Sequence, residues 1–349
     1  MKEIGNNLKR IRLLQNLSLE KAGELLHMSA PAVAKYEKGL ITPNSEKLIE
    51  FADAYKVNVT DILKVYNTPN MKFASFRKKQ RLQGQNLELL KEIIQNKVAD
   101  YLEVIELNNT DAEMIKLKRF NCESIEDARN AADEFKKYYH LSLNQPMIDL
   151  INILENLGIL VILIDNVDNK FSDFDGLSEV VNSIPIIVLL KDEDGARQRF
   201  TIAHELGHLV LNIKNEKLNE ERMCNQFAGS LLMPKEAVLK EFGVSRNRIS
   251  YYELTTFKKE YKASMAAIIY RLKDLSIISE NLLKNLYITF NIVGIKKNEP
   301  IKIEPEQSYQ FEKIVHKLET SNIISLNKAC ELLGISVNEY YNQDNNYGY

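Results

Sequence analysis

The sequence predicts an α+β protein that is mostly helical and carries one small sheet. Apolar residues recur at helical spacing over most of the chain, whereas two short continuous apolar runs, 159–164 and 184–190, break that period as buried strands do. With 349 residues, 45% hydrophobic and 27% charged, the chain is long enough for two or three domains. We expect a helix bundle over 1–67, a helical linker over 68–120, a domain holding the sheet over 121–278, and a C-terminal helical region over 279–349.

The amino-acid composition indicates the cellular compartment in which we expect the protein. The three cysteines are widely spaced, which favours free thiols in a reducing cytoplasm. No apolar run approaches the roughly 20 residues that span a bilayer, and the N-terminus does not resemble a signal peptide, so we expect a cytoplasmic protein with no membrane partner. Residues 1–67 hold 10 Lys and Arg against 8 Asp and Glu, and residues 68–97 hold 7 against 2. This positive end could bind a polyanion, although a basic connector is often only a solvated face.

The first segment reads as a bundle of short helices. Four apolar residues recur at helical spacing, namely Ile4, Leu8, Ile11 and Leu14. Ser18 suits the N-cap of a helix over 19–26 that buries Leu25 and Leu26. Ser29 caps the next helix, which tolerates a proline in its first turn, points Val33 and Tyr36 inward and ends near Gly39. Two short helices joined by a tight turn can place the second in a DNA major groove.

Residues 1–66 resemble the helix-turn-helix domains of the Xre/Cro repressor family. The likeness rests on Ser-Ala-Pro-Ala-Val-Ala-Lys-Tyr-Glu-Lys-Gly over 29–39, on Pro43, and on 55–63. It implies a five-helix bundle that binds DNA, with Ser29, Ala30, Ala32, Lys35 and Lys38 as candidate contacts. Among the outward residues of the second helix, only Lys35 can donate a hydrogen bond to a base edge. A protein-docking module on the same fold is the alternative.

The linker and the start of the next domain are predicted to be helical. Long helical segments are expected from Phe73 to about Glu106, with an apolar stripe at Leu87, Leu90, Ile94, Val98, Tyr101, Leu102 and Ile105. Another amphipathic helix runs from Ser124 to Tyr139. Pro146 then begins a helix that ends at Gly158, with Met147, Leu150, Ile151 and Leu154 facing inward.

The small sheet follows Gly158. Residues 159–164 form one expected strand, and 175–181 and 184–190 form a pair that turns at Asn182-Ser183. An exposed strand at the edge of a sheet can hold an extended peptide by adding it to the sheet. Gly176, Leu177 and Ser178 are therefore the candidate substrate-binding residues.

The stretch 199–211 contains His-Glu-Leu-Gly-His, an H-E-x-x-H pattern. On a helix His204 and His208 project about 40° apart, one turn above the other, so both imidazoles can reach one ion. Glu205 projects about 100° from His204, where a general base can take a proton from the attacking water. Gly207 costs up to about 1 kcal/mol of helix propensity, which suggests that another element approaches closely there. Two core histidines beside a buried glutamate are the structural alternative.

A catalytic zinc site needs a third protein ligand. The next helix, expected over 218–233, offers Glu220 and Glu221, and periodicity does not choose between them because each lies about 50° from the centre of the apolar face. From about Ser124 to Ser276 the chain resembles the ImmA/IrrE family of metallopeptidases, through 199–208, through Glu-Arg-Met-Cys-Asn-Gln-Phe-Ala over 221–228, and through 231–234. The resemblance implies a zincin-like domain in which His204, His208 and Glu221 bind Zn²⁺, or another divalent metal, and Glu205 is the catalytic base.

Cys224 departs from the family pattern, in which alanine is commoner. It is either a small buried hydrophobic residue or a thiol near the metal that binds the metal or responds to oxidation.

The resemblance implies an endopeptidase fused to a DNA-binding domain, with a helix-turn-helix repressor as its protein substrate. Two alternatives stay open: a transcription regulator whose peptidase-like domain senses a metal or another ligand without cutting, and an antitoxin-like protein that binds a partner. A homodimer is compatible with all three.

Overall fold

The computed structural model describes residues 2–64, 69–73, 82, 84–108, 117–191, 194–215, 217–292, 294, 299 and 301–346. The chain divides into two compact units. The first comprises residues 1–71, 79–103 and 166–174, and the second comprises 72–78, 104–165 and 175–349. Within the described ranges, no helix has both the length and the apolar character that a membrane span needs.

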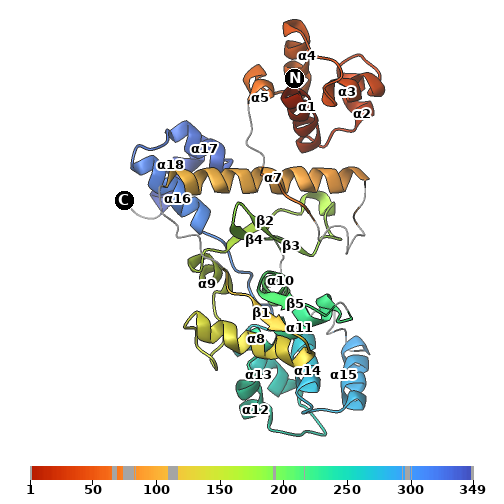
Figure 1. Ribbon diagram of the computed structural model, residues 1–349, viewed down its shortest axis with the longest axis vertical. Helices are drawn as coiled ribbons and strands as arrows, with labels where there is room; N and C mark the ends of the chain where they lie inside the picture. Colours follow the sequence, from red (N-terminus) through yellow and green to blue (C-terminus); the bar gives the residue numbers. More distant parts are fainter. Residues whose placement is uncertain are drawn as a thin grey trace. The chain divides into compact units, whose positions relative to one another are not determined.

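The first unit begins with the predicted bundle of five helices (Figure 1). Its helices are α1 (Lys2–Leu14), α2 (Leu19–Leu25), α3 (Ala30–Glu37), α4 (Ser45–Tyr55) and α5 (Val59–Leu63). They enclose a core of Leu8, Ile11, Ala22, Leu26, Val33, Phe51, Ala52, Tyr55 and Ile62. Leu25, which was predicted to be buried, is instead exposed on α2, and Leu14 is exposed at the end of α1.

A buried ion pair fixes α3 against α1. Arg12 donates from Nε to Glu37 Oε1 at 2.5 Å and from Nη2 to Glu37 Oε2 at 2.9 Å, and its third nitrogen donates to the Leu17 carbonyl. Such a two-point contact fixes orientation as well as distance. Gly5 permits the close approach, because a Cβ there would lie 2.6 Å from the Glu37 carbonyl oxygen. The orientation of α3, the helix expected to enter DNA, therefore depends on α1.

The described part of the linker contains one long helix. Phe73 is not helical and has a left-handed φ of 49°, and α7 runs over Gly84–Leu107. The rest of the predicted opening, 74–81, lies outside the described residues, as does most of the basic cluster. Leu90, Ile94, Val98 and Tyr101 are buried as expected. Leu89 and Val104 are also buried, whereas Leu87, Leu102 and Ile105 are only partly covered, so the apolar stripe is rotated slightly from its expected position.

A three-stranded sheet lies in the order β2-β4-β3. Strands β2 (Leu160–Ile164) and β4 (Ile184–Leu190) are parallel, and β3 (Gly176–Val181) pairs antiparallel with β4. Asn182 and Ser183 both have positive φ, as the two central residues of a type I′ hairpin turn require, which confirms the predicted turn. The short 3-10 turn η1 (Val167–Asn169) belongs to the first unit.

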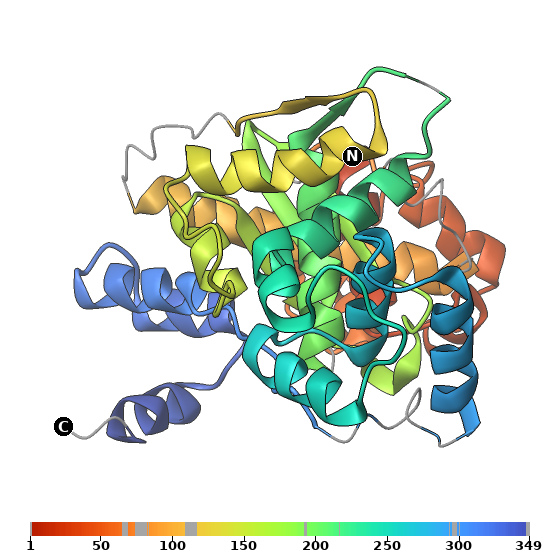
Figure 2. The same ribbon diagram turned by 90° about the horizontal axis from the view of Figure 1, so that it is seen from below.

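A second pair of strands was not predicted. β1 (Phe120–Cys122) and β5 (Leu211–Ile213) are parallel, and β5 directly continues the helix α10 (Gly195–Val210) (Figure 2). Three-residue strands are too short to show alternation. The pair fixes the end of α10 to the start of α8 (Ile125–Tyr138), which packs along α11 (Glu220–Leu232).

The remaining helices complete the second unit. They are α9 (Leu150–Asn156), α12 (Lys235–Phe242), α13 (Tyr251–Tyr261), α14 (Met265–Asp274), α15 (Glu280–Ile292), α16 (Gln310–Thr320), α17 (Leu326–Leu333) and α18 (Val337–Asn346). The helix predicted from Pro146 begins only at Leu150, because Asp149 at its N-cap has a left-handed φ of 59°. Its expected inward residues, including Met147, are buried. Lys262 lies in the turn between α13 and α14, with a left-handed φ of 54°.

Candidate metal centre

Helix α10 carries both predicted histidines into the interior of the second unit. Asp194 caps its start by accepting a hydrogen bond from the Ala196 amide at 2.9 Å. Ile202, Ala203, Leu206, Leu209 and Val210 bury the face that packs into the core. His204 and His208 stand one turn apart on a neighbouring face, with their ring centroids 5.0 Å apart.

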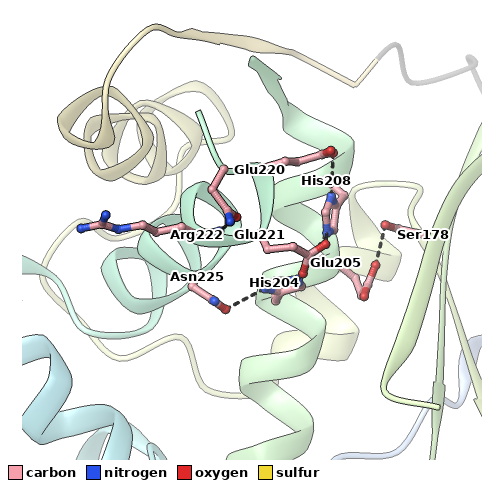
Figure 3. A network of polar contacts seen from close by, with 9 residues as sticks. Ser178, His204, Glu205, His208, Glu220, Glu221, Arg222 and Asn225 are labelled. Atoms are coloured by element: carbon pink, nitrogen blue, oxygen red, sulfur yellow. Dashed lines mark hydrogen bonds and ion pairs between the residues drawn. The ribbon is translucent and has the colours of Figure 1, made fainter. Parts of the chain in front are cut away.

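Helix α11 brings the third predicted ligand to the same point (Figure 3). His204 Nε2 lies 3.2 Å from His208 Nε2. Glu221 places Oε2 3.3 Å from His204 Nε2 and Oε1 3.4 Å from His208 Nε2. One ligand atom from each residue therefore lies within 4.8 Å of the others, as a shared ion requires.

The distances fit a small tetrahedral ion. Donors about 2.05 Å from a zinc ion at tetrahedral angles are about 3.3 Å apart. The two Nε2 atoms are 3.2 Å apart, close to that value, and Glu221 places one oxygen near each of them. Two imidazole nitrogens and a carboxylate are a common ligand set of catalytic zinc sites, and they leave one position open. The residues therefore fit a divalent metal such as zinc.

Two outer contacts orient the imidazoles. His204 Nδ1 lies 2.9 Å from Asn225 Oδ1, and His208 Nδ1 lies 3.0 Å from Glu220 Oε1. If each Nδ1 donates, each Nε2 keeps a lone pair directed at the shared point, which is how metal-binding histidines are usually held. The two glutamates that periodicity could not separate thus occupy different places: Glu221 faces the shared point, and Glu220 contacts the far side of His208.

Glu205 lies beside this point, between α10 and β3. It is 1% exposed, and its Oε2 accepts a hydrogen bond from Ser178 Oγ at 2.7 Å. A Cβ added to Gly176 would lie 3.0 Å from Glu205 Cγ and 3.1 Å from Oε1. The predicted substrate strand β3 therefore packs directly against Glu205. The Leu177 side chain is buried, so only its backbone could meet a substrate.

Gly207 marks the contact between the two ligand-bearing helices. A Cβ at this position would lie 3.2 Å from both Cα and Cβ of Cys224 and 3.3 Å from its Sγ. This is the close approach that the glycine predicted. Cys224 is fully buried, and burial raises the pKa of its thiol, which also contacts His208.

The surroundings of His208 stabilise a positive charge on its ring. Burial alone would lower the pKa of His208, but hydrogen bonds with Cys224 and Glu221 and the nearby Glu205 charge outweigh it and raise the pKa to about 11. A proton and a divalent cation therefore compete for the same ring nitrogen.

The candidate DNA-binding residues lie together on α3 in the first unit. Ser29, Lys35 and Lys38 are exposed, and Ala30 and Ala32 are partly exposed. Ser29 stands at the N-cap, although its side chain makes no capping hydrogen bond.

The contact of Asn225 with His204 was not predicted from the sequence, nor was that of Glu220 with His208. Asn225 belongs to the motif quoted above, and its position four residues after Glu221 puts it on the same helix face, which was the available signal.

Two family models match separate parts of the chain. The family model described as the IrrE N-terminal-like domain, a peptidase family, matches residues 154–273, and a helix-turn-helix family model matches residues 8–62. No curated protein matches.

Solved structures resemble the chain only weakly. Bacillus thuringiensis PlcR in complex with the peptide PapR7 and DNA is 12% identical, with 98% of this chain and 99% of that chain covered, at a TM-score of 0.18. The Streptococcus dysgalactiae SHP pheromone receptor Rgg2 is 12% identical, with 98% and 100% covered, at 0.16. PrgX in the PrgX/iCF10 complex is 13% identical, with 96% and 95% covered, at 0.17. These scores are too low to support a shared fold.

The two family matches and the His-His-Glu cluster carry the assignment. The chain joins a helix-turn-helix domain to an IrrE N-terminal-like, metallopeptidase-type domain. This combination is that of a DNA-binding regulator with a peptidase-like domain.

Proposed function

We propose that this protein is a DNA-binding, zinc-dependent endopeptidase of the cytoplasm that cleaves a helix-turn-helix repressor and so relieves repression. The observation that carries the proposal is the convergence of His204, His208 and Glu221, which place one ligand atom each within 4.8 Å of the others. His204, His208 and Glu221 would hold the ion, which when bound lowers the pKa of water and polarises the scissile carbonyl.

The chain's own residues supply the proton transfers. Glu205 stands next to His204 and accepts a proton from the attacking water, then delivers it to the leaving amine. Ser178 holds one Glu205 oxygen by its hydrogen bond and so orients the other. The surrounding burial strengthens each of these electrostatic interactions.

The substrate is proposed to lie along β3. This strand is at the edge of the sheet, so an extended peptide can add to it through backbone hydrogen bonds. Gly176 and Ser178 both contact Glu205, so a peptide aligned there would bring its scissile bond close to the proposed base.

Fusion to a DNA-binding domain gives the peptidase a high effective concentration near a repressor on the same DNA. We expect residues 1–67 to bind DNA through α3, with Lys35 and Lys38 donating to bases or phosphates. If deletion of residues 1–66 left repressor cleavage in cells unchanged, tethering would be excluded.

Replacement of Glu205 by Gln tests the peptidase assignment. A peptidase loses about 10²-fold or more in cleavage rate while still binding zinc, because glutamine cannot accept the proton. Glu236→Gln, an exposed glutamate at the start of α12, is the matched control and should cleave normally. A Glu205→Gln variant that regulates transcription as the wild type does would instead identify a sensor that does not cut. The inactive variant also serves as bait, since it should retain the uncut substrate for sequencing.

A further inference from the structure

A segment outside the matched peptidase domain contacts the start of the helix that carries the metal ligands. This strap, defined here as residues 301–308, has no regular secondary structure and leads into α16 (Figure 1). It lies C-terminal to the 154–273 family match. The strap and α10 belong to the same compact unit of the chain.

The strap packs with its backbone against the first turn of α10. The Gly195 amide donates a hydrogen bond to the Ile303 carbonyl at 2.9 Å. A Cβ on Gly195 would lie 2.3 Å from the Glu304 carbonyl oxygen and 2.8 Å from that of Ile303. Any side chain at this position would collide with the strap, so the glycine at the helix start allows the close approach.

The Gln198 side chain binds both backbone groups of one strap residue. Its Nε2 donates to the Glu306 carbonyl at 2.9 Å, and its Oε1 accepts from the Glu306 amide at 2.7 Å. Gln198 is 2% exposed, so water cannot replace these two hydrogen bonds if they are lost. The pair of bonds fixes the strap along the helix axis.

The Glu306 side chain joins α10 to α9. Its Oε1 accepts a hydrogen bond from Arg199 Nη1, and its Oε2 accepts one from the Ile151 amide in the first turn of α9 at 2.8 Å. The Arg199 side chain is 1% exposed and that of Glu306 is 12% exposed. Loss of the Glu306 charge would leave Arg199 as an uncompensated buried cation, so this contact strongly favours one position of α10.

The strap approaches α10 from the side opposite the metal ligands. On an α-helix Arg199 projects about 140° from His204 and about 180° from His208. The ligand side of α10 is held by α11 and β3, through the contacts at Gly207 and Glu205 described above. The helix is therefore fixed between the strap on one side and these two elements on the other.

A change at the strap reaches the ligands because α10 is one continuous helix. Gln198 precedes His204 by six residues, which is about 9 Å along the helix axis. A packed helix moves as a rigid element over such a distance. Metal sites tolerate only about 0.2 Å in ligand distance, so a small shift or rotation of the first turn is enough to disturb the site.

We propose that Glu306 is a positioning residue for the metal centre: through Gln198 and Arg199 it fixes α10, and so the direction in which His204 and His208 meet Glu221. This inference rests on the function proposed above. It makes the strap part of the peptidase machinery, although the strap lies outside the family match.

Glu306→Gln and Glu299→Gln form a matched pair of variants. Glu299, just before the strap, makes a second buried ion pair with Lys258 on α13, and the two side chains are 16% and 1% exposed. Glu299 also accepts a hydrogen bond from the Met265 amide at the start of α14. Each variant loses one ion pair of similar burial, so we expect similar falls in the urea midpoint. Only Glu306→Gln removes a contact with α10.

Two measurements on the full chain separate positioning from stability. Hydrogen exchange of the metal-free protein, followed in peptides that cover residues 195–208, should be about tenfold faster in Glu306→Gln and unchanged in Glu299→Gln. The affinity for added Co²⁺ should fall about tenfold or more in Glu306→Gln alone. The visible spectrum of bound Co²⁺, which reports the ligand geometry, should change in the same variant.

Gln198→Met serves as a second variant, because it removes the two hydrogen bonds to the Glu306 backbone without leaving a buried charge. It should shift both measurements in the same direction as Glu306→Gln. Equal changes in Glu306→Gln and Glu299→Gln would show only a loss of stability and would overturn the inference. A wild type that binds no Co²⁺ would refute the proposed metal centre, whereas unchanged Co²⁺ binding in Glu306→Gln would refute this inference alone.

Discussion

Replacing Gly207 by alanine should separate the two helices that carry the metal ligands. The new Cβ would lie 3.2 Å from Cα and Cβ of Cys224, tighter than ordinary carbon contacts, so α10 and α11 must move apart by a few tenths of an ångström. Overpacking of this kind costs about 1–3 kcal/mol, against up to about 1 kcal/mol of helix propensity gained by alanine. Metal sites tolerate only about 0.2 Å in ligand distance. We therefore expect Gly207→Ala to weaken zinc binding about tenfold or more.

Gly229→Ala provides the matched control. Gly229 also lies within a helix, α11, but nothing lies within 4 Å of its added Cβ. This variant should gain up to about 1 kcal/mol in stability and bind zinc as the wild type does. Zinc affinity can be measured by competition with a chromophoric chelator, and stability by urea unfolding. Wild-type zinc affinity in Gly207→Ala, with a urea midpoint equal to that of Gly229→Ala, would refute the close packing on which the site geometry rests.

Other variants test the contacts around the site and in each unit. Glu220→Gln should weaken zinc binding about tenfold, at the low end of the usual range because Glu220 is partly exposed. The control Glu126→Gln, in the first turn of α8, should bind zinc as the wild type does. Equal zinc affinities of the two variants would show that Glu220 does not support the site. Burial lowers the pKa of the Lys136 amine from its usual 10.5 to about 8, so at pH 7 the folded state holds an unfavourable charge. Lys136→Met should raise the free energy of unfolding by about 3 kcal/mol at pH 7, and this gain should shrink as the pH rises from 8 towards 10.5; a gain independent of pH would contradict the assignment. Glu37→Gln leaves Arg12 as a buried unpaired charge and should destabilise the first bundle by about 3–5 kcal/mol in thermal unfolding, whereas the double variant Arg12→Met with Glu37→Leu should recover most of the loss.

Local signals predicted much of the fold. The Asn182-Ser183 pair between two strand-like stretches was enough to place β3 and β4. The structure confirms the turn, because both residues have the positive φ that a two-residue hairpin turn requires. The strands β1 and β5 could not be predicted, because three residues carry no period and their pairing joins segments about 90 residues apart. Leu25 was expected inside because it is apolar, yet its exposure depends on which face of α2 the other helices of the bundle cover, and the local sequence does not fix that packing.

The candidate site, like the fold, could be predicted only in part from the sequence. The H-E-x-x-H spacing alone placed His204, Glu205 and His208, since helix geometry fixes their relative directions. It could not separate Glu220 from Glu221, because both lie at similar angles and the difference is set by the distance between α10 and α11. The close approach at Gly207 supplies that distance. The contacts of Asn225 and Ser178 likewise depend on how three separate elements pack.

Metal content measured on the purified full chain tests the central claim most directly. We predict one equivalent of zinc in the wild type, its loss in His204→Ala and Glu221→Ala, and its retention in Glu205→Gln. Folded Glu221→Ala protein that keeps a full equivalent of metal would contradict the proposed centre, as would wild-type protein that binds none in the presence of added zinc.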